Sequence, residues 1–149
     1  MKKIIIMTIL LIVSTNALAE WVYLTSSSDS KVYINSKPTK KRGHKVKLWT
    51  LQDYEKTQLL GEQTGYYTGS GSLDSALGIE HNEQYYKSTI DIDEYDCAEE
   101  TSVNYGATFY SGNMGTGKII ASSNQRGSPK EIVPDTIGEA EYEFACNKK

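Results

Sequence analysis

The stretch Ser102–Ser123, SVNYGATFYSGNMGTGKIIASS, constrains the fold of this chain more than any other. In its first half every second residue is apolar, the period of a β-strand with one face toward a core and one toward water. These apolar residues are Val103, Tyr105, Ala107 and Phe109. A glycine-rich turn at 111–117 and the short β-branched run 118–121 follow. The pattern predicts an antiparallel hairpin.

Residues 1–19 have the features of a cleaved signal peptide. Two lysines precede the apolar run 4–13, and Ala17-Leu18-Ala19 has the small-x-small pattern of a cleavage site. A membrane anchor is disfavoured because a helix needs about 20 apolar residues to span a bilayer. We therefore expect an exported protein, in the periplasm, on the cell surface or secreted. Its single domain is expected to comprise residues 20–149.

The chain has two cysteines, Cys97 before the predicted hairpin and Cys146 after it. In an exported protein such a pair most simply forms one disulfide. The ring of about 50 residues would stabilise the fold by about 4 kcal/mol in the chain-entropy model. A cysteine-based metal site is disfavoured because His44 and His81 lie far from both cysteines and in no ligand spacing.

Four further segments have the patterns of β-strands. Residues 21–24 and 31–34 are expected to form a hairpin, and the longer 46–54 has a phase change that indicates two covered faces or a bulge. Residues 85–95 alternate as a half-buried strand. There we expect Tyr86, Ser88, Ile90 and Ile92 on one face and Tyr85, Lys87, Thr89, Asp91 and Asp93 on the other, which faces water.

A C-terminal helix is predicted to begin after Thr136 and to end at Cys146. Thr136 and Glu139 have the spacing of a capping box. An apolar stripe of Ile137, Ala140 and Phe144 would lie on the sheet. A Cys97–Cys146 bond would therefore join the helix to a strand end.

Residues 55–84 interrupt the strand patterns and are predicted to be a long surface insertion. They contain five glycines and the pair Tyr66-Tyr67, with no sustained period. A loop of this length inside a compact domain is usually functional or mobile. An insertion without a role is the open alternative.

Two motifs resemble chemical sites but are better explained as structure. Gly112–Lys118 has the spacing of a phosphate-binding loop, but Ile119 stands where a magnesium-binding Ser or Thr is needed and a strand follows. The acidic run lacks the glycine and the bidentate glutamate of a calcium loop, so we interpret it as a solvated strand face and turn. Its members are Asp91, Asp93, Glu94, Asp96, Glu99 and Glu100.

The connector between the second and third strands reverses the charge of an acidic chain. The net charge of −3 becomes −5 once Lys2 and Lys3 are removed, which argues against nucleic acid as a partner. Six of the remaining 14 Lys and Arg residues lie in this connector and the strand after it: Lys37, Lys40, Lys41, Arg42, Lys45 and Lys47. The cluster would attract an acidic polysaccharide, a lipid headgroup or an acidic protein. The alternative is a solubilising loop whose lysines discourage edge pairing.

Several segments, in order, resemble the surface-adhesin protein E family of Gram-negative bacteria. They are Trp21–Leu24 with Lys31–Ile34, Val46–Tyr54, Asp93–Cys97, Tyr110–Gly115, and Ile132–Ala140 continuing through Phe144–Cys146. The resemblance implies an α+β fold, with an antiparallel sheet of about six strands, a C-terminal helix and joined cysteines. It also implies no catalytic site, no cofactor, and binding to host extracellular-matrix or serum proteins.

We therefore expect a non-enzymatic exported binding module that contacts a protein partner through sheet-edge and loop surfaces. The candidate contacts are Lys40, Lys41, Arg42, Tyr66 and Tyr67. The alternative function is a periplasmic structural or envelope protein with the same fold and no host ligand. A hydrolase that uses the carboxylates has no supporting spacing or nucleophile motif.

Overall fold

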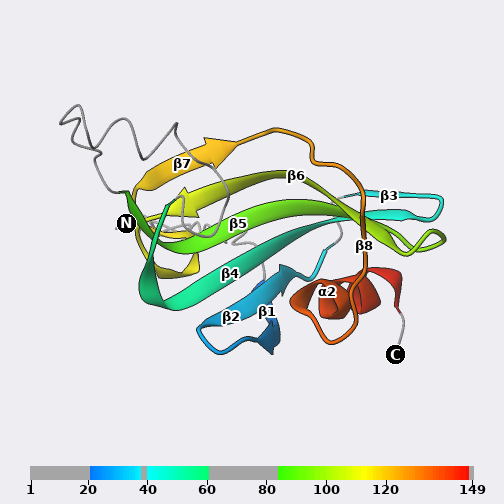
Figure 1. The fold of residues 1–149 in the computed structure, drawn as a ribbon, viewed down its shortest axis with the longest axis horizontal. Helices are drawn as coiled ribbons and strands as arrows, with labels where there is room; N and C mark the ends of the chain where they lie inside the picture. The colour runs from blue at the N-terminus through cyan, green and yellow to red at the C-terminus, as the bar shows by residue number, and fades with distance from the viewer. Residues whose placement is uncertain (1–20, 38–39, 61–83, 148–149) are drawn as a thin grey trace, which may run out of the picture.

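The computed structural model describes residues 21–37, 40–60 and 84–147, which form one antiparallel sheet with a helix on one face (Figure 1). The strand order is β1-β2-β4-β5-β6-β7, with β3 paired to β4 and β8 paired to β6. The elements are β1 Trp21–Ser26, β2 Ser30–Asn35, β3 Lys40–Arg42, β4 Lys45–Leu59, β5 Tyr85–Asp96, β6 Thr101–Tyr110, η1 Asn113–Gly115, β7 Ile119–Ser123, β8 Lys130–Glu131 and α2 Ile137–Cys146. The predicted α+β class, antiparallel sheet and C-terminal helix are confirmed.

The predicted 102–123 hairpin is present as β6 and β7, and the connection between them contains the 3-10 turn η1. Gly115 in this turn has φ +68°, and a Cβ there would lie 2.7 Å from Ile90 Cδ1 on the sheet. Glycine therefore lets the turn lie directly on the sheet. Gly112–Lys118 is thus a connection between two strands, as predicted.

The expected alternation along β6 is wrong at its centre, because the strand contains a bulge. The register with β5 passes from the pair Ile92 and Gly106 to the pair Asp93 and Asn104, which leaves Tyr105 as an extra residue. A bulge resets which face each side chain takes. Val103 therefore does not share a face with Ala107.

Both faces of β4 are covered, the first of the two alternatives that its sequence allowed. Its register with β5 is continuous from Lys45 to Asp53. Val46 and Leu48 pack in the cluster under α2, whereas Leu51, which is fully buried, lies near Gly115 of the η1 turn on the other face. The predicted strand end at Tyr54 is wrong, because β4 continues to Leu59.

Among the residues that the structure describes, the core has two clusters. The first lies between the sheet and α2 and comprises Ile34, Val46, Leu48, Tyr95, Tyr142 and Ala145. The second is aromatic: the ring centroid of Tyr86 lies 5.5 Å from that of Tyr54 and 5.0 Å from that of Phe109, both edge to face. Such ring pairs add stability beyond the area they bury.

Helix α2 begins at its predicted cap. The Thr136 hydroxyl accepts a hydrogen bond from the Glu139 N–H at 3.3 Å, and Glu139 Oε2 accepts one from the Asp135 N–H at 2.7 Å. The predicted apolar stripe lies off the centre of the contact. Tyr142 and Ala145 are the buried residues of the helix, and Ala140 and Phe144 lie at its flank.

Replacing the cap residue, Thr136→Ala, is expected to lower the free energy of unfolding by about 1 kcal/mol, because a backbone donor of the first turn loses its partner. Urea unfolding measures the change. Thr136→Ser keeps the hydroxyl and serves as the control. Equal stabilities for the Ala and Ser variants would contradict this account of the cap.

Candidate binding site

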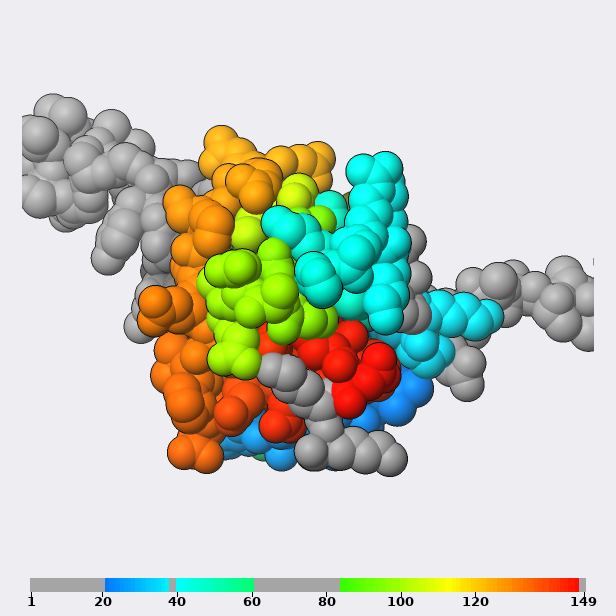
Figure 2. Space-filling view, turned by 90° about the vertical axis from the view of Figure 1, so that its right-hand side faces the viewer, coloured from blue at the N-terminus to red at the C-terminus, as the bar shows by residue number. Residues whose placement is uncertain are grey.

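The candidate site lies at one end of the sheet, where three segments meet. Figure 2 shows the β3–β4 hairpin, the turn between β5 and β6 and helix α2 side by side at this end. Gly43, with φ +57°, forms the tight turn of the hairpin. The His44 carbonyl accepts a hydrogen bond from the Cys97 N–H at 2.8 Å, which ties the hairpin to the β5–β6 turn.

The hairpin divides its cations between the two faces of the sheet. Lys41 pairs with Val46, so both face α2, whereas Lys40 and Arg42 pair with Lys47 and Lys45 and face the opposite side. All three β3 side chains are exposed. Sequence alone brought these cations together as one cluster, but the strand pairing separates them.

Only part of this positive charge is neutralised within the described residues. Lys45 Nζ lies 3.4 Å from Asp96 Oδ2, and Lys47 Nζ lies 3.9 Å from Glu94 Oε2. No ion pair among the described residues involves the three β3 cations. The β3 edge of the hairpin therefore presents uncompensated positive charge to solvent.

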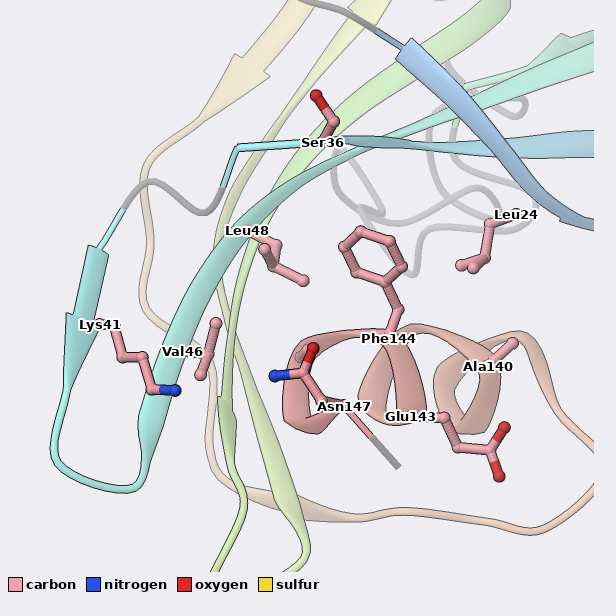
Figure 3. A pocket seen from close by; sticks show the side chains of 10 residues that line it. Leu24, Ser36, Lys41, Val46, Leu48, Ala140, Glu143, Phe144 and Asn147 are labelled. Carbon is pink, nitrogen blue, oxygen red and sulfur yellow. The ribbon is translucent and has the colours of Figure 1, made fainter. Parts of the chain in front are cut away.

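A pocket of about 590 Å³ lies between the hairpin and α2. Figure 3 shows Phe144 projecting from α2 toward Leu48 and Leu24. Lys41 from β3 and Glu143 from α2 supply its charged groups. The described residues that line it are Leu24, Ser36, Lys41, Val46, Leu48, Ala140, Glu143, Phe144, Ala145 and Asn147. The pocket thus combines an apolar floor with one cation and one anion.

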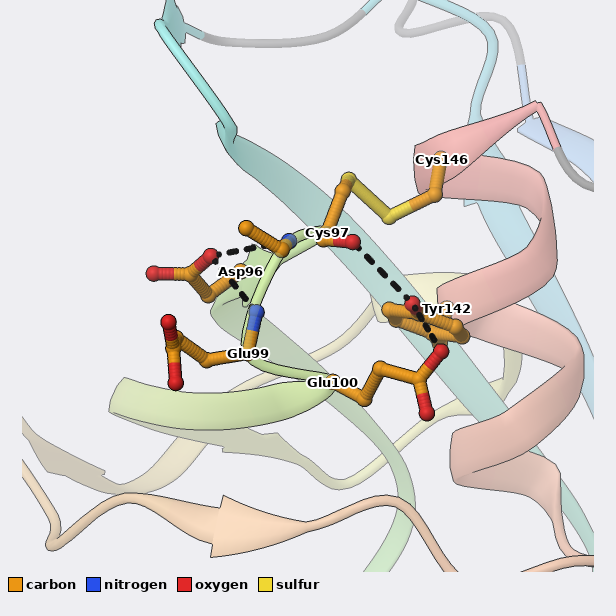
Figure 4. Close-up of a disulfide and its surroundings, with 7 residues drawn as sticks. Asp96, Cys97, Glu99, Glu100, Tyr142 and Cys146 are labelled. Atoms are coloured by element: carbon orange, nitrogen blue, oxygen red, sulfur yellow. Dashed lines mark hydrogen bonds between the residues drawn. A yellow bond between two sulfur atoms is a disulfide. The ribbon is translucent and has the colours of Figure 1, made fainter.

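The end of α2 is fixed beside this pocket by a cap and a disulfide. Asn147 adopts a left-handed conformation, φ 52° and ψ 34°, and its N–H bonds to the carbonyls of Glu143 and Phe144. Cys146 is joined to Cys97 with a Cα–Cα distance of 5.6 Å (Figure 4). The predicted disulfide is confirmed, and it holds the helix end against the β5–β6 turn.

Two acidic side chains of that turn, Asp96 and Glu100, have structural partners. Asp96 Oδ1 accepts hydrogen bonds from the N–H groups of Ala98 and Glu99 at 3.1 and 3.3 Å (Figure 4). Tyr142 donates to Glu100 Oε1 at 3.5 Å. Within the described residues, no group of three or more His, Cys, Asp or Glu side chains is placed to hold a metal ion.

The prediction that Asp91 and Asp93 face water is wrong. Their pairing with Thr50 and Leu48 of β4 places them on the α2 side of the sheet, where both are half-buried. Asp93 Oδ1 accepts a hydrogen bond from Asn104 Nδ2 at 3.0 Å. Alternation distinguishes the two faces of a strand, but it does not say which faces a helix will cover.

Glu141 of α2 completes a group of three carboxyls on this face. Its Oε2 accepts a hydrogen bond from the Tyr95 hydroxyl at 2.7 Å. Burial raises the pKa of Asp91 to about 7, that of Asp93 to about 6 and that of Glu141 to about 8. Part of the rise for Asp91 and Glu141 comes from the negative charge of Asp93. None of the three lines the pocket.

The structure locates only part of the predicted site. Lys40, Lys41 and Arg42 form β3, whereas Tyr66 and Tyr67 lie outside the described residues. Sequence reasoning missed most of the pocket lining, which comes from three strands, the segment after β2, and the helix end. The one local signal was the spacing of Ala140 and Phe144, which indicated a shared helix face.

Within the described residues, no helix is both long and apolar enough to cross a membrane.

Comparisons with known proteins give a family and a fold. Residues 21–147 match the family described as surface-adhesin protein E. A crystal structure of protein E from non-typeable Haemophilus influenzae is 15% identical, with a TM-score of 0.58 over 89% of this chain and 79% of that chain. Crystal form II of Haemophilus influenzae protein E is 15% identical, with a TM-score of 0.57 over 89% and 91%. Curated protein sequences give no match.

Proposed function

This chain belongs to the surface-adhesin protein E family, and from that premise we propose that it is an exported, non-enzymatic module that binds host extracellular-matrix or serum proteins. Members of an adhesin family work by presenting a surface to a partner. We propose that residues 1–19 direct export and are removed, and that residues 20–149 form the binding domain. Tyr66 and Tyr67 of the 55–84 insertion are proposed as further contacts.

The observation that carries the proposal is the uncompensated charge of β3. Lys40, Lys41 and Arg42 are exposed on an otherwise acidic chain, and no ion pair within the described residues offsets them. Complementary charge steers association and selects the partner. An acidic segment of a matrix or serum protein therefore fits this surface better than a basic one does.

Replacing Lys40, Lys41 and Arg42 by Ser is expected to weaken binding to an immobilised matrix or serum protein by about tenfold, equivalent to about 1.4 kcal/mol. Surface plasmon resonance against laminin-rich matrix and whole serum protein measures the loss. The loss should shrink as salt is raised, because exposed charges are screened.

The matched control removes three exposed lysines from elsewhere: Lys31, Lys56 and Lys118, each to Ser. It changes the net charge by the same amount, so retained binding in this control assigns the effect to β3. Equal losses in the two triple variants would reject the β3 surface. The alternative, a periplasmic envelope protein, is tested by protease treatment of intact cells: complete protection of the protein would exclude an adhesin.

A further inference from the structure

The pocket between the β3–β4 hairpin and α2 has the dimensions and chemistry of a ligand site. Its volume of about 590 Å³ falls within the roughly 300–1,000 Å³ of pockets that bind small ligands or peptide segments. Its accessible apolar surface comes from Leu24 and Phe144, which are partly buried, whereas Leu48 and Val46 lie buried beneath it. An apolar group entering this space would cover apolar surface that is now accessible.

The charged groups of the pocket narrow the choice of ligand. Lys41 comes from β3 and Glu143 from the exposed flank of α2, and both side chains are exposed. No ion pair between them, or between either of them and another described residue, is present. A ligand that places a carboxylate at Lys41 and a hydrogen-bond donor at Glu143 would satisfy both. An extended peptide offers backbone N–H donors beside an acidic side chain, whereas a hydrocarbon or fatty acyl chain offers no donor.

The strand register gives Lys41 a role that its neighbours lack. Lys41 is paired with Val46 and lines the pocket, but Lys40 is paired with Lys47 and faces the other side of the sheet. The two residues have the same charge, are adjacent in sequence and are both exposed. They therefore differ in orientation rather than in chemistry.

We propose that this pocket receives an acidic peptide segment of the partner protein, with one aromatic or branched apolar side chain packed against Leu24 and Phe144. A carboxylate next to that side chain pairs with Lys41. This inference rests on the proposed binding function and names the part of the partner that is recognised.

The test uses acetylated, amidated synthetic peptides as probes, Gly-Asp-Phe-Asp-Gly with matched Gly-Asn-Phe-Asn-Gly and Gly-Asp-Ala-Asp-Gly. Binding to the purified protein is followed by NMR chemical-shift changes. The first probe is expected to bind at least about fivefold more tightly than either control, because each control lacks one of the two groups recognised. Equal binding of all three probes would overturn the proposal.

Two variants of the protein locate the probe. Lys41→Ser is expected to weaken the affinity for the Asp-Phe-Asp probe by about fivefold. Lys40→Ser should weaken this affinity by less than about twofold, since of the two lysines only Lys41 faces the pocket. Equal effects would show diffuse charge attraction and reject the site. Ala140→Phe, which fills the pocket from the helix side, should abolish the shifts. If this substitution instead altered a concentration-dependent self-association, a second copy would be the occupant and the proposal would fail.

The same variants distinguish this inference from the proposed function. Unchanged binding to matrix or serum proteins by Lys41→Ser and Ala140→Phe would remove the pocket from that interaction and leave the adhesin function standing. Specific binding of the Asp-Phe-Asp probe without any binding to matrix or serum proteins would keep the pocket as a peptide site and reject the adhesin function. Folding of each variant is checked by its melting temperature and its NMR spectrum.

Discussion

Removing the disulfide in a Cys97→Ala/Cys146→Ala variant is expected to lower the free energy of unfolding by about 4 kcal/mol. The two cysteines are separated by 49 residues in sequence, so the bond restricts a long loop of the unfolded chain. It also fixes the last residue of α2 to the β5–β6 turn. Only Tyr142 and Ala145 are buried in this ten-residue helix. A loss of about 4 kcal/mol is a large share of the stability of a typical domain.

Urea unfolding of the double variant and of the parent protein measures the difference. Replacing both cysteines leaves no free thiol that could form intermolecular bonds. The parent protein, with its disulfide reduced under native conditions, provides the matched control. Its free energy of unfolding should equal that of the double variant. A difference below about 1 kcal/mol would show that packing alone holds the helix. The Asp-Phe-Asp probe should also bind the double variant more weakly, because the helix forms one wall of the pocket.

The features predicted well from sequence are those with local signals. The β6–β7 hairpin, the cap at Thr136 and the pairing of two cysteines in an exported chain each depend on residues close in sequence or on a single possible partner. The structure confirms all three. The family resemblance implied an antiparallel sheet of about six strands with a C-terminal helix.

The features that were missed depend on which surfaces meet in three dimensions. Asp91 and Asp93 alternate with apolar residues as a solvated face would, yet α2 covers that face. Glu141, about 50 residues further along the chain, joins them there. Likewise the pocket takes Leu24, Lys41 and Phe144 from three distant elements. No local sequence period indicates that these elements lie together. The register of β3 with β4 decides that Lys41 rather than Lys40 faces the pocket.

The three half-buried carboxyls, Asp91, Asp93 and Glu141, make the stability of the fold depend on pH. Each pKa in the folded protein, about 7 for Asp91, about 6 for Asp93 and about 8 for Glu141, lies above its ordinary value of 3.8 or 4.5. At a pH between the ordinary pKa and the raised pKa of each group, the folded state binds more protons than the unfolded state. The free energy of unfolding therefore falls as pH rises. The stabilising contribution is complete below about pH 4 and is lost as pH rises through about 6 to 8.

The melting temperature is therefore expected to fall by at least about 5 °C from pH 5 to pH 8.5. Glu141→Gln should flatten this profile, because its amide still accepts the Tyr95 hydrogen bond but carries no charge. Glu143→Gln, on the exposed flank of the same helix, should leave the profile unchanged. Asp96 acts in the opposite direction: desolvation raises its pKa, but bonds from Ala98, Glu99 and Lys45 lower it overall. Its effect is therefore confined to more acidic solutions. A melting temperature that is constant or rises over pH 5 to 8.5 would mean that these carboxyls ionise freely beneath the helix, and the packing of α2 over Asp91 and Asp93 would have to be looser than described.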